Sequence, residues 1–490
     1  LLALSVGCSE KPHETAPPSP GRELFTRMPS GFTGVTFVNR LSETHDFNVF
    51  TYRNFYNGGG VAIGDLTGDG LPEIVLTSNQ DGPKVYLNLG QFRFGDVTRH
   101  AGVDERDRWT TGVTLADLNG DGKLDIYVCH AGLKPGSARA NTLYINQGMT
   151  DGTPHFTEMA AQYGLGDTGY STQAAFFDYD GDSDLDMFLI RNSPRPVASI
   201  AVKNQRTERD SLGGHKLYRN DSGHFVDVSE RAGIYGPMIG FGLGIAVGDV
   251  NRDGRPDVYI ANDFFERDYL YLNDGNGTFR EVLEDALPVS SYFSMGVDVA
   301  DIDNDGWPDI YTSDMLPEDD YRLKTTQAFE PWTVYEGKAH DGFGHQLMRN
   351  MLQRNNGNGT FSDVAWQAGV ARTDWSWAAL IADFDLDGNK DIFVANGLSR
   401  DVTSQDYIAF LSNDQTLLAA TRDGKQRVDF ESLIAAMSST KLSNYAFRND
   451  GELNFTKVSA AWGLDQPSFS NGAAFAHLDG DGPLDVLLNK

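Results

Sequence analysis

The chain of 490 residues carries 69 acidic against 40 basic side chains, a net charge of -29. A surface this acidic has the wrong sign for binding phosphates, so we expect no nucleic-acid partner. Its two cysteines are too few for a disulfide framework. No stretch approaches the length of about 18 apolar residues that a membrane span needs, so we expect membrane contact only through a lipid anchor.

The chain opens with "LLALSVG", which is typical of the end of an apolar signal-peptide core, followed by Cys8 and a Pro-rich polar stretch. This arrangement predicts a bacterial lipoprotein signal with the Cys8 thiol as acylation site; a plain cleaved secretory signal is the alternative. We expect residues 1–8 to be the signal remnant and lipobox, 9–22 a tether and 23–490 a propeller. The localisation that follows is extracytoplasmic, on the outer membrane or cell surface.

Two strands are predicted next, "ELFTRM" from Glu23 and "TGVTFVN" from Thr33. Seven repeats follow, and in most of them four strands can be read, called A to D: an apolar strand such as "GVAIGD", an acidic loop, a "DIYV" strand, an "LYLN" strand and a short fourth strand. This pattern predicts an all-β, seven-bladed β-propeller with four-stranded blades. The last repeat stops after two strands, so the N-terminal strands would close the ring. Uneven spacings of 52 to 94 residues between loops argue against a β-solenoid.

The seven acidic loops, numbered in chain order, keep one register, as in "DLNGDGKLD" from Asp117 to Asp125. Turning alone gives no reason for a carboxylate at positions 1, 5 and 9 in nearly every loop. Calcium does, because it takes six to eight hard oxygen ligands, here completed by the carbonyl of position 7. The expected side-chain ligands, loop by loop, are Asp65, Thr67, Asp69 and Glu73; Asp117, Asn119, Asp121 and Asp125; Asp178, Asp180, Asp182 and Asp186; Asp249, Asn251, Asp253 and Asp257; Asp301, Asp303, Asp305 and Asp309; Asp383, Asp385, Asp387 and Asp391; Asp479, Asp481 and Asp485.

The loops are not equivalent. Loops 5 and 6 offer four carboxylates each, loop 3 has Ser183 at the turn glycine, and loop 7 begins with His477, a soft nitrogen ligand that predicts the weakest site. Seven bound calcium ions would reduce the charge of -29 to about -15. Magnesium is the alternative ion, disfavoured because it demands tight octahedral geometry.

The segments "NGGGVAIGDLTGDG", "TDWSWAALIADFDLDG" and "FSNGAAFAHLDGDGPLD" resemble FG-GAP or VCBS repeats, whose loops bind calcium in integrin α-subunit propellers. They look most like the bacterial CRTAC1-like proteins, whose repeats are commonly followed by an ASPIC/UnbV region that this sequence does not show. The resemblance implies a cell-surface or secreted calcium-binding protein and transfers no catalytic residue.

The sequence shows no catalytic motif such as GxSxG or HExxH, so no enzyme is expected. In "KAHDGFGH", His340, Asp341 and His345 are the nearest to a catalytic cluster, and a surface loop is the simpler interpretation. A protein-interaction or adhesion module is the first hypothesis; a carbohydrate-binding or polysaccharide-processing propeller and a structural subunit of an extracellular assembly are the alternatives.

The connections between strands B and C are long, and one of them contains a predicted helix around "DFESLIAAM" that Asp429 would cap. Loops this long are uncommon unless they bind something or are disordered, and these contain aromatic residues. We therefore expect a protein or glycan partner on the face opposite the acidic loops. The four long connections are 129–142, 191–216, 314–346 and 396–444.

Overall fold

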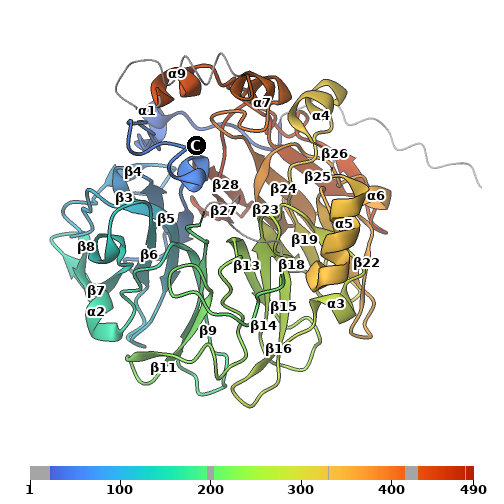
Figure 1. The fold of residues 1–490 in the computed structure, drawn as a ribbon. Coiled ribbons are helices and arrows are strands. Elements are labelled where there is room, and N and C mark those ends of the chain that lie inside the picture. Colours follow the sequence, from blue (N-terminus) through green and yellow to red (C-terminus); the bar gives the residue numbers. More distant parts are fainter. Residues whose placement is uncertain (1–22, 196–202, 329, 414–428, 481) are drawn as a thin grey trace, which may run out of the picture.

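The computed structural model describes residues 23–195, 203–328, 330–413, 429–480 and 482–490. Six four-stranded antiparallel sheets stand radially around one axis (Figure 1). Each follows the predicted order, with strand A innermost. From inner to outer strand the sheets are β1 (Val61–Gly64), β2 (Glu73–Ser78), β3 (Gly82–Asn88) and β4 (Phe94–Asp96); β5 (Trp109–Ala116), β6 (Asp125–Ala131), β7 (Thr142–Thr150) and β8 (Thr153–Glu158); β9 (Ser171–Phe177), β10 (Asp186–Arg191), β11 (Lys216–Asn220) and β12 (Phe225–Asp227); β13 (Gly242–Gly248), β14 (Asp257–Asn262), β15 (Tyr269–Asn273) and β16 (Phe279–Glu281); β18 (Val297–Ala300), β19 (Asp309–Thr312), β21 (Met351–Asn355) and β22 (Phe361–Asp363); β23 (Ser376–Ala382), β24 (Asp391–Asn396), β25 (Tyr445–Asn449) and β26 (Phe455–Lys457).

The chain is therefore an all-β propeller. A further two-stranded sheet, β27 (Ala473–Ala476) and β28 (Asp485–Leu488), lies between the sixth sheet and the first. Ala378 N donates to Asn471 O at 3.2 Å on one side, and Asn489 Nδ2 donates to Gly60 O at 3.0 Å on the other. These bonds close the ring of inner strands around the axis.

The predicted N-terminal strands are not formed. No residue between Glu23 and Glu43 belongs to a strand, and the short helix α1 (Ser30–Thr33) interrupts the segment. Phe25 N makes a single backbone bond to Trp462 O at 2.9 Å, and Val35 and Phe37 pack on the hydrophobic cluster beside β28. The segment thus covers the two-stranded sheet through side chains and not through a hydrogen-bonded ladder. Its apolar alternation in the sequence is the same in both arrangements and so could not distinguish them.

The core lies between neighbouring sheets. Strand B is buried along its whole length in each of the six four-stranded sheets, as its short apolar runs suggest. Between the second and third sheets, for example, Cys129 and Leu143 pack against Met187 and Leu189. Cys129 is thus a small buried hydrophobe, as its sequence context predicts, and burial raises the pKa of its thiol.

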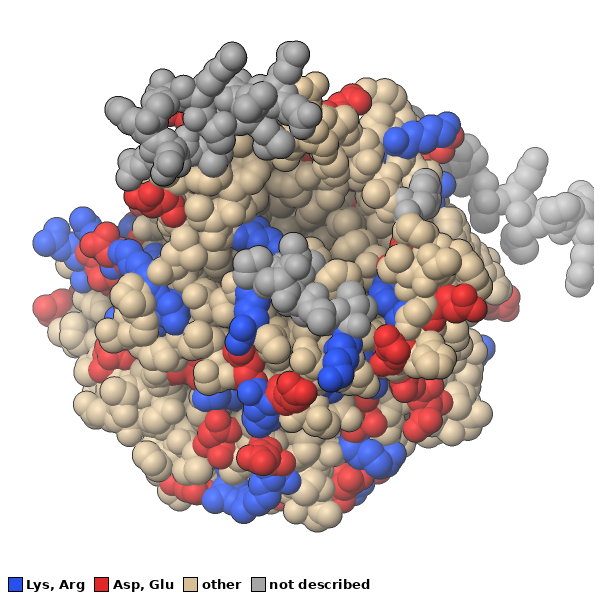
Figure 2. All heavy atoms as spheres, viewed as in Figure 1, with Lys and Arg blue, Asp and Glu red and all other residues tan. Residues whose placement is uncertain are grey.

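The long B-to-C connections carry most of the helices. The fifth sheet contributes α4 (Asp320–Thr326), α5 (Trp332–Lys338) and the π-helical turn η4 (Ala339–Phe343), and the sixth contributes α7 (Gln405–Leu411) and α9 (Phe430–Ala435). Asp429 caps α9 by accepting from Ser432 N at 3.1 Å, as predicted. Figure 1 shows α4, α7 and α9 side by side at one edge of the disc. In the same view the face is hollowed near its centre, and acidic and basic side chains are interspersed over it (Figure 2).

The short elements outside the B-to-C connections are η1 (Arg53–Tyr56), α2 (Ala160–Tyr163), α3 (Leu283–Ala286) and α6 (Ala365–Ala368), whereas η2 (Gly136–Arg139) lies in the B-to-C connection of the second sheet. The strand β17 (Ser290–Ser291) pairs in parallel with β20 (Gln346–Leu347), which lies in the B-to-C connection of the fifth sheet. Among the described residues, no helix has the length and apolarity to cross a bilayer. The predicted lipobox and tether, residues 1–22, lie outside the described part of the chain.

Candidate metal centres in the acidic loops

All seven acidic loops join strands A and B in the same hairpin register. In each hairpin, the acid at position 9 is the partner of the residue that precedes position 1. The partners are Glu73 and Gly64, Asp125 and Ala116, Asp186 and Phe177, Asp257 and Gly248, Asp309 and Ala300, Asp391 and Ala382, and Asp485 and Ala476. The common register found in the sequence is therefore a common geometry.

The acids of each loop organise its backbone. In loop 2, Asp117 Oδ2 accepts from Gly122 N at 2.8 Å, and Asp121 Oδ1 accepts from Lys123 N at 3.0 Å. The same two bonds recur in the other loops from loop 1 to loop 6. Position 6 has a left-handed backbone, with φ of 82° at Gly122 and 75° at Ser183. Loop 3 thus makes the same turn with a serine, at some conformational cost.

The acid at position 9 is buried in loops 1 to 6. In loop 5, Asp309 accepts from Ile302 N at 2.9 Å through one oxygen and from Asn355 N at 2.7 Å through the other. Burial, and then repulsion by Asp303 and Asp305, raise the pKa of Asp309 to about 7. The pKa of the corresponding acid is raised for the same reasons in loops 1 to 4 and 6. Burial therefore disfavours the ionised form of this acid in each of loops 1 to 6.

Three of the loops bring three carboxylates together. One oxygen from each acid lies within 4.8 Å of the others in Asp178, Asp180 and Asp186; in Asp301, Asp303 and Asp309; and in Asp383, Asp385 and Asp391. In loop 5, Asp301 Oδ1 is buried and has no hydrogen-bond partner. A buried carboxylate oxygen is costly without a partner, so the donor set of loop 5 fits a hard divalent cation.

The other loops differ in the way that their sequences suggest. Loops 1, 2 and 4 carry neutral oxygens at position 3, from Thr67, Asn119 and Asn251, and therefore hold fewer acids. In loop 7, His477 Nδ1 lies 2.9 Å from the carbonyl oxygen of Pro483, which is position 7. The imidazole thus engages the backbone oxygen that the sequence pattern predicts to be an ion ligand. Asp481 lies outside the described residues.

One asparagine in strand C connects consecutive loops, a role that we did not predict although the residue recurs in six repeats. Asn355 Nδ2 donates to Val250 O of loop 4 at 2.8 Å, while its backbone N donates to Asp309 of loop 5. The same inter-blade bond is made by Asn146 to Leu66 O, Asn273 to Tyr179 O and Asn449 to Ile302 O. Asn88 bonds Leu478 O of loop 7 at 2.9 Å, which joins the first sheet to the last.

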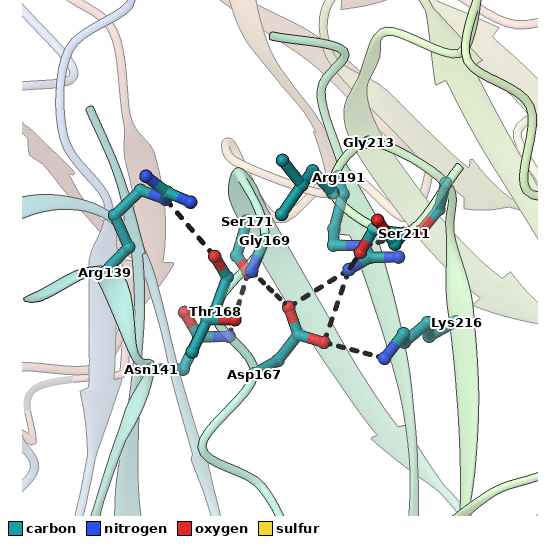
Figure 3. Close-up of polar contacts among 12 residues, drawn as sticks. Arg139, Asn141, Asp167, Thr168, Gly169, Ser171, Arg191, Ser211, Gly213 and Lys216 are labelled. Atoms are coloured by element: carbon teal, nitrogen blue, oxygen red, sulfur yellow. Dashed lines mark hydrogen bonds and ion pairs between the residues drawn. The ribbon is translucent and has the colours of Figure 1, made fainter. Parts of the chain in front are cut away.

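The buried polar cluster around Asp167 joins two neighbouring blades. Figure 3 shows Asp167 accepting from Gly169 N at 2.8 Å, Arg191 Nη1 at 3.2 Å and Lys216 Nζ at 3.0 Å. Burial alone would raise the pKa of Asp167, but Arg191 and Lys216 lower it to about 2. Asn141 N donates to Asp167 O at 2.9 Å, so the cluster ties the second blade to the third. This arrangement stabilises the junction between the two blades.

Two further candidates in the described part of the chain are the loop around His340 and a cavity on the axis. The His340 side chain is 90% exposed and lies 3.6 Å from Asp341, whereas His345 Nδ1 lies 2.9 Å from Tyr335 OH. A cavity of about 560 Å³ on the axis is lined by the inner strands and contains Asp298. Both oxygens of Asp298 accept backbone bonds, from Val299 N and Ile381 N.

Comparison with known proteins agrees with this architecture. A model of the FG-GAP-like repeat matches residues 49–128, 207–260, 249–312 and 343–394. The chain contains FG-GAP-like repeats. It is 29% identical to cartilage acidic protein 1 of Xenopus tropicalis over 43% of this chain and 29% of that protein, and 24% identical to the Mus musculus protein over 69% and 57%. The alignments thus span less than two thirds of these relatives.

Similar solved structures include a lectin from Agrocybe aegerita with specific recognition of non-reducing terminal N-acetylglucosamine, with 15% identity, coverage of 90% of this chain and 88% of that chain, and a TM-score of 0.40. The biofilm matrix protein Bap1 of V. cholerae has 14% identity, coverage of 67% and 42%, and a TM-score of 0.34. Likenesses this distant carry no argument about what the FG-GAP-like propeller binds.

Proposed function

We propose that this FG-GAP-like propeller binds calcium through its acidic loops and acts outside the cytoplasm as a non-catalytic interaction module. The observation that carries the proposal is loop 5, where three carboxylates converge and Asp301 Oδ1 is buried without a partner. Calcium accepts such a mixed set of carboxylate, amide, hydroxyl and carbonyl oxygens more readily than magnesium, which requires a strict octahedron. His477 makes loop 7 the weakest of the seven sites.

Thermal melts test the calcium proposal. For a site with a dissociation constant near 0.1 mM, 1 mM calcium adds about 1.4 kcal/mol, so six or seven independent sites add roughly 8 to 10 kcal/mol. We expect a large rise in melting temperature between EGTA and 1 mM calcium, and a much smaller rise with 1 mM magnesium. An identical melting temperature in EGTA and calcium would contradict the proposal.

We further propose that β27 and β28 are the inner half of a seventh blade, with residues 23–43 covering its outer side. The packing of Val35 and Phe37 beside β28 supports this. Amide hydrogen exchange distinguishes a strand that completes the seventh blade from a segment that packs through side chains alone. A strand formed over residues 33–39 in the calcium-loaded protein would protect alternate amides. Exchange as fast as in exposed loops would leave the propeller with six complete blades.

The partner, protein or glycan, is proposed to dock on the face that carries the long B-to-C connections. In an antiparallel blade consecutive turns alternate between the two faces, which puts these connections opposite the acidic loops. Deleting residues 400–440 should abolish partner capture and leave the calcium-dependent melting intact. A partner mapped to the acidic-loop face would refute this assignment.

A glycan is the second candidate ligand, favoured by one exposed aromatic group on α5. Trp332 is 69% exposed and its ring centroid lies 5.3 Å from that of Tyr335. Exposed flat rings of this kind stack on sugars. Glycan-array binding that is lost in Trp332→Ala, but kept in a matched Trp366→Ala variant, would support this ligand.

For localisation, we propose that Cys8 is acylated and anchors the protein on the outer surface of a bacterial membrane. Replacing Cys8 with alanine should then move the protein from the membrane fraction to the soluble fraction. A wild-type protein that is already soluble would argue against the anchor.

A further inference from the structure

The residue immediately before the strand-C asparagine differs between two groups of blades. Where position 3 of the loop is an aspartate, in loops 3, 5 and 6, this residue is an arginine: Arg219, Arg354 and Arg448. Where position 3 is neutral, in loops 1, 2 and 4, it is aliphatic: Leu87, Ile145 and Leu272. The fourth acid and the arginine therefore occur together or not at all in these six blades.

The fifth blade shows the contact directly. Arg354 lies on β21, and its Nε donates to Asp303 Oδ2 at 2.8 Å. Its Nη2 lies 3.6 Å from Asp305 Oδ2. The side chain of Asp303 is only 9% exposed, so the arginine acts on a largely desolvated carboxylate. It thus contacts the acids at positions 3 and 5 of the loop.

The arginines of the third and sixth blades have a competing partner. Arg219 Nε donates to Asp221 Oδ1 at 2.7 Å, and Arg448 Nε donates to Asp450 Oδ1 at 2.8 Å. These aspartates lie two residues after the arginine, where the fifth blade has Asn356. Because Asn356 carries no charge, the positive charge of Arg354 is directed to loop 5.

The pairing offsets the fourth acid of loop 5. Loop 5 carries four carboxylates, and Arg354 reduces their net charge to three negative units. Loops 2 and 4 reduce theirs differently, because Lys123 and Arg255 at position 7 pair with the acid at position 5. A fourth acid without the arginine would increase the repulsion in the empty loop and the attraction for a cation.

We propose that Arg354 is a positioning residue that holds Asp303 and lowers the cation affinity of loop 5 below that of the same four carboxylates without the arginine, an inference that rests on the proposed calcium binding. Arg219 and Arg448 exert the same effect more weakly, because Asp221 and Asp450 share their charge. The Arg354–Asp303 pair thus sets both the order of loop 5 without an ion and its affinity for one.

Loop 5 contains its own spectroscopic probe. Trp307 occupies position 7, whose carbonyl would face the ion, and no other loop has a tryptophan among its nine residues. Terbium bound in loop 5 would be excited by energy transfer from Trp307, so calcium competition reads out the affinity of this one loop. The Trp307→Phe variant controls for emission sensitised by other tryptophans.

We expect Arg354→Leu to lower the calcium dissociation constant of loop 5 by about tenfold, as obtained from the competition after correction for the terbium dissociation constant of the same variant. This is the effect of removing a unit charge of order 6 Å from a divalent ion at a water-like dielectric, since the Arg354 side chain is 43% exposed. Arg354→Lys, which keeps the charge, should remain near the wild type. Asp303→Asn should weaken binding by a similar factor, and Arg354→Leu combined with Asp303→Asn should return it to within about threefold of the wild type. In 0.5 M salt the effect of Arg354→Leu should shrink, because exposed charges are screened.

The matched control is Arg448→Leu, which removes the equivalent arginine of the next blade and should leave the Trp307 signal unchanged. A wild-type affinity in folded Arg354→Leu, or a lysine variant that behaves like the leucine variant, would overturn the role of the arginine while calcium binding stands. Absence of Trp307-sensitised terbium emission from the wild type, together with no calcium-dependent melting, would overturn the proposed function itself and this inference with it.

Discussion

The strand-C asparagines offer a direct measure of the bonds between blades. Asn88 is buried, and its Nδ2 donates to Pro72 O at 3.0 Å within its own blade and to Leu478 O at 2.9 Å in the last sheet. Its Oδ1 accepts from Gly90 N at 2.9 Å. Asn220 occupies the same position in the third blade, where its Nδ2 donates to Leu185 O of its own blade at 3.1 Å and its Oδ1 accepts from Gly223 N. The two residues therefore differ by one inter-blade bond.

The expected cost of each alanine substitution follows from these bonds. A hydrogen bond contributes about 1 kcal/mol net, and a buried carbonyl left without a donor adds about 1 to 3 kcal/mol. We predict that Asn88→Ala lowers the free energy of unfolding by about 3 to 5 kcal/mol and Asn220→Ala by about 2 to 3 kcal/mol. The difference of about 1 to 2 kcal/mol is the contribution of the bond to Leu478.

Urea unfolding at saturating calcium, followed by tryptophan fluorescence, measures both variants under one condition. Asn146→Ala is the control within the ring, because Asn146 also makes one intra-blade bond and one inter-blade bond. It should match Asn88→Ala. If Asn220→Ala proves as costly as the other two variants, the inter-blade bond contributes nothing and the reasoning is refuted.

Two further predictions concern the core. Burial raises the pKa of Asp268 to about 7, so its ionised form destabilises the fold and stability should fall as the pH rises from about 4 to 7. Asn141 occupies the corresponding place in the second blade and bonds a tyrosine and a serine there. Asp268→Asn should therefore have a higher melting temperature than the wild type at pH 8 and lose that advantage at pH 5. An equal difference in melting temperature at both pH values would show that ionisation is not the cause. Gly296→Ala should destabilise the protein by about 3 kcal/mol or more, because a Cβ there would overlap Trp377 O, whereas Gly166→Ala, whose Cβ would make only ordinary van der Waals contact with Ala161 at 3.9 Å, should be nearly neutral in the same melts.

The acidic loops and the inner strands could be predicted because both depend on local sequence. Alternating acids fix the turn of each loop by bonding its own backbone, as Asp117 does with Gly122, and the apolar run behind them forms a buried strand. The N-terminal strands could not be predicted, since Val35 and Phe37 have the same apolar alternation as a strand residue but bury their side chains without a ladder. The local pattern of apolar residues predicts which side chains are buried, but not which backbone segments pair in a sheet.

The contacts that shape the candidate sites join residues far apart in the chain. Nothing near Asn355 in the sequence indicates that its side chain bonds Val250. Arg354 contacts Asp303 whereas Arg448 contacts Asp450, because only the turn after Arg448 supplies a competing acid. The meaning of that difference becomes clear only when equivalent blades are compared in space. His477 is an intermediate case, because its soft nitrogen predicts a poor ligand and its bond to Pro483 O shows how the loop closes instead.

The bond between Asn88 and Leu478 also has a consequence for biogenesis. Its two ends are 390 residues apart, and a ribosome adds about 5 to 20 residues each second. During translation, roughly 20 to 80 seconds therefore pass between synthesis of the first blade and synthesis of the β27–β28 sheet that packs beside it. The apolar side of the first blade stays exposed for that time. That interval is long enough for aggregation or for capture by a chaperone, and a secretion route that keeps the chain unfolded until synthesis is complete would remove the hazard.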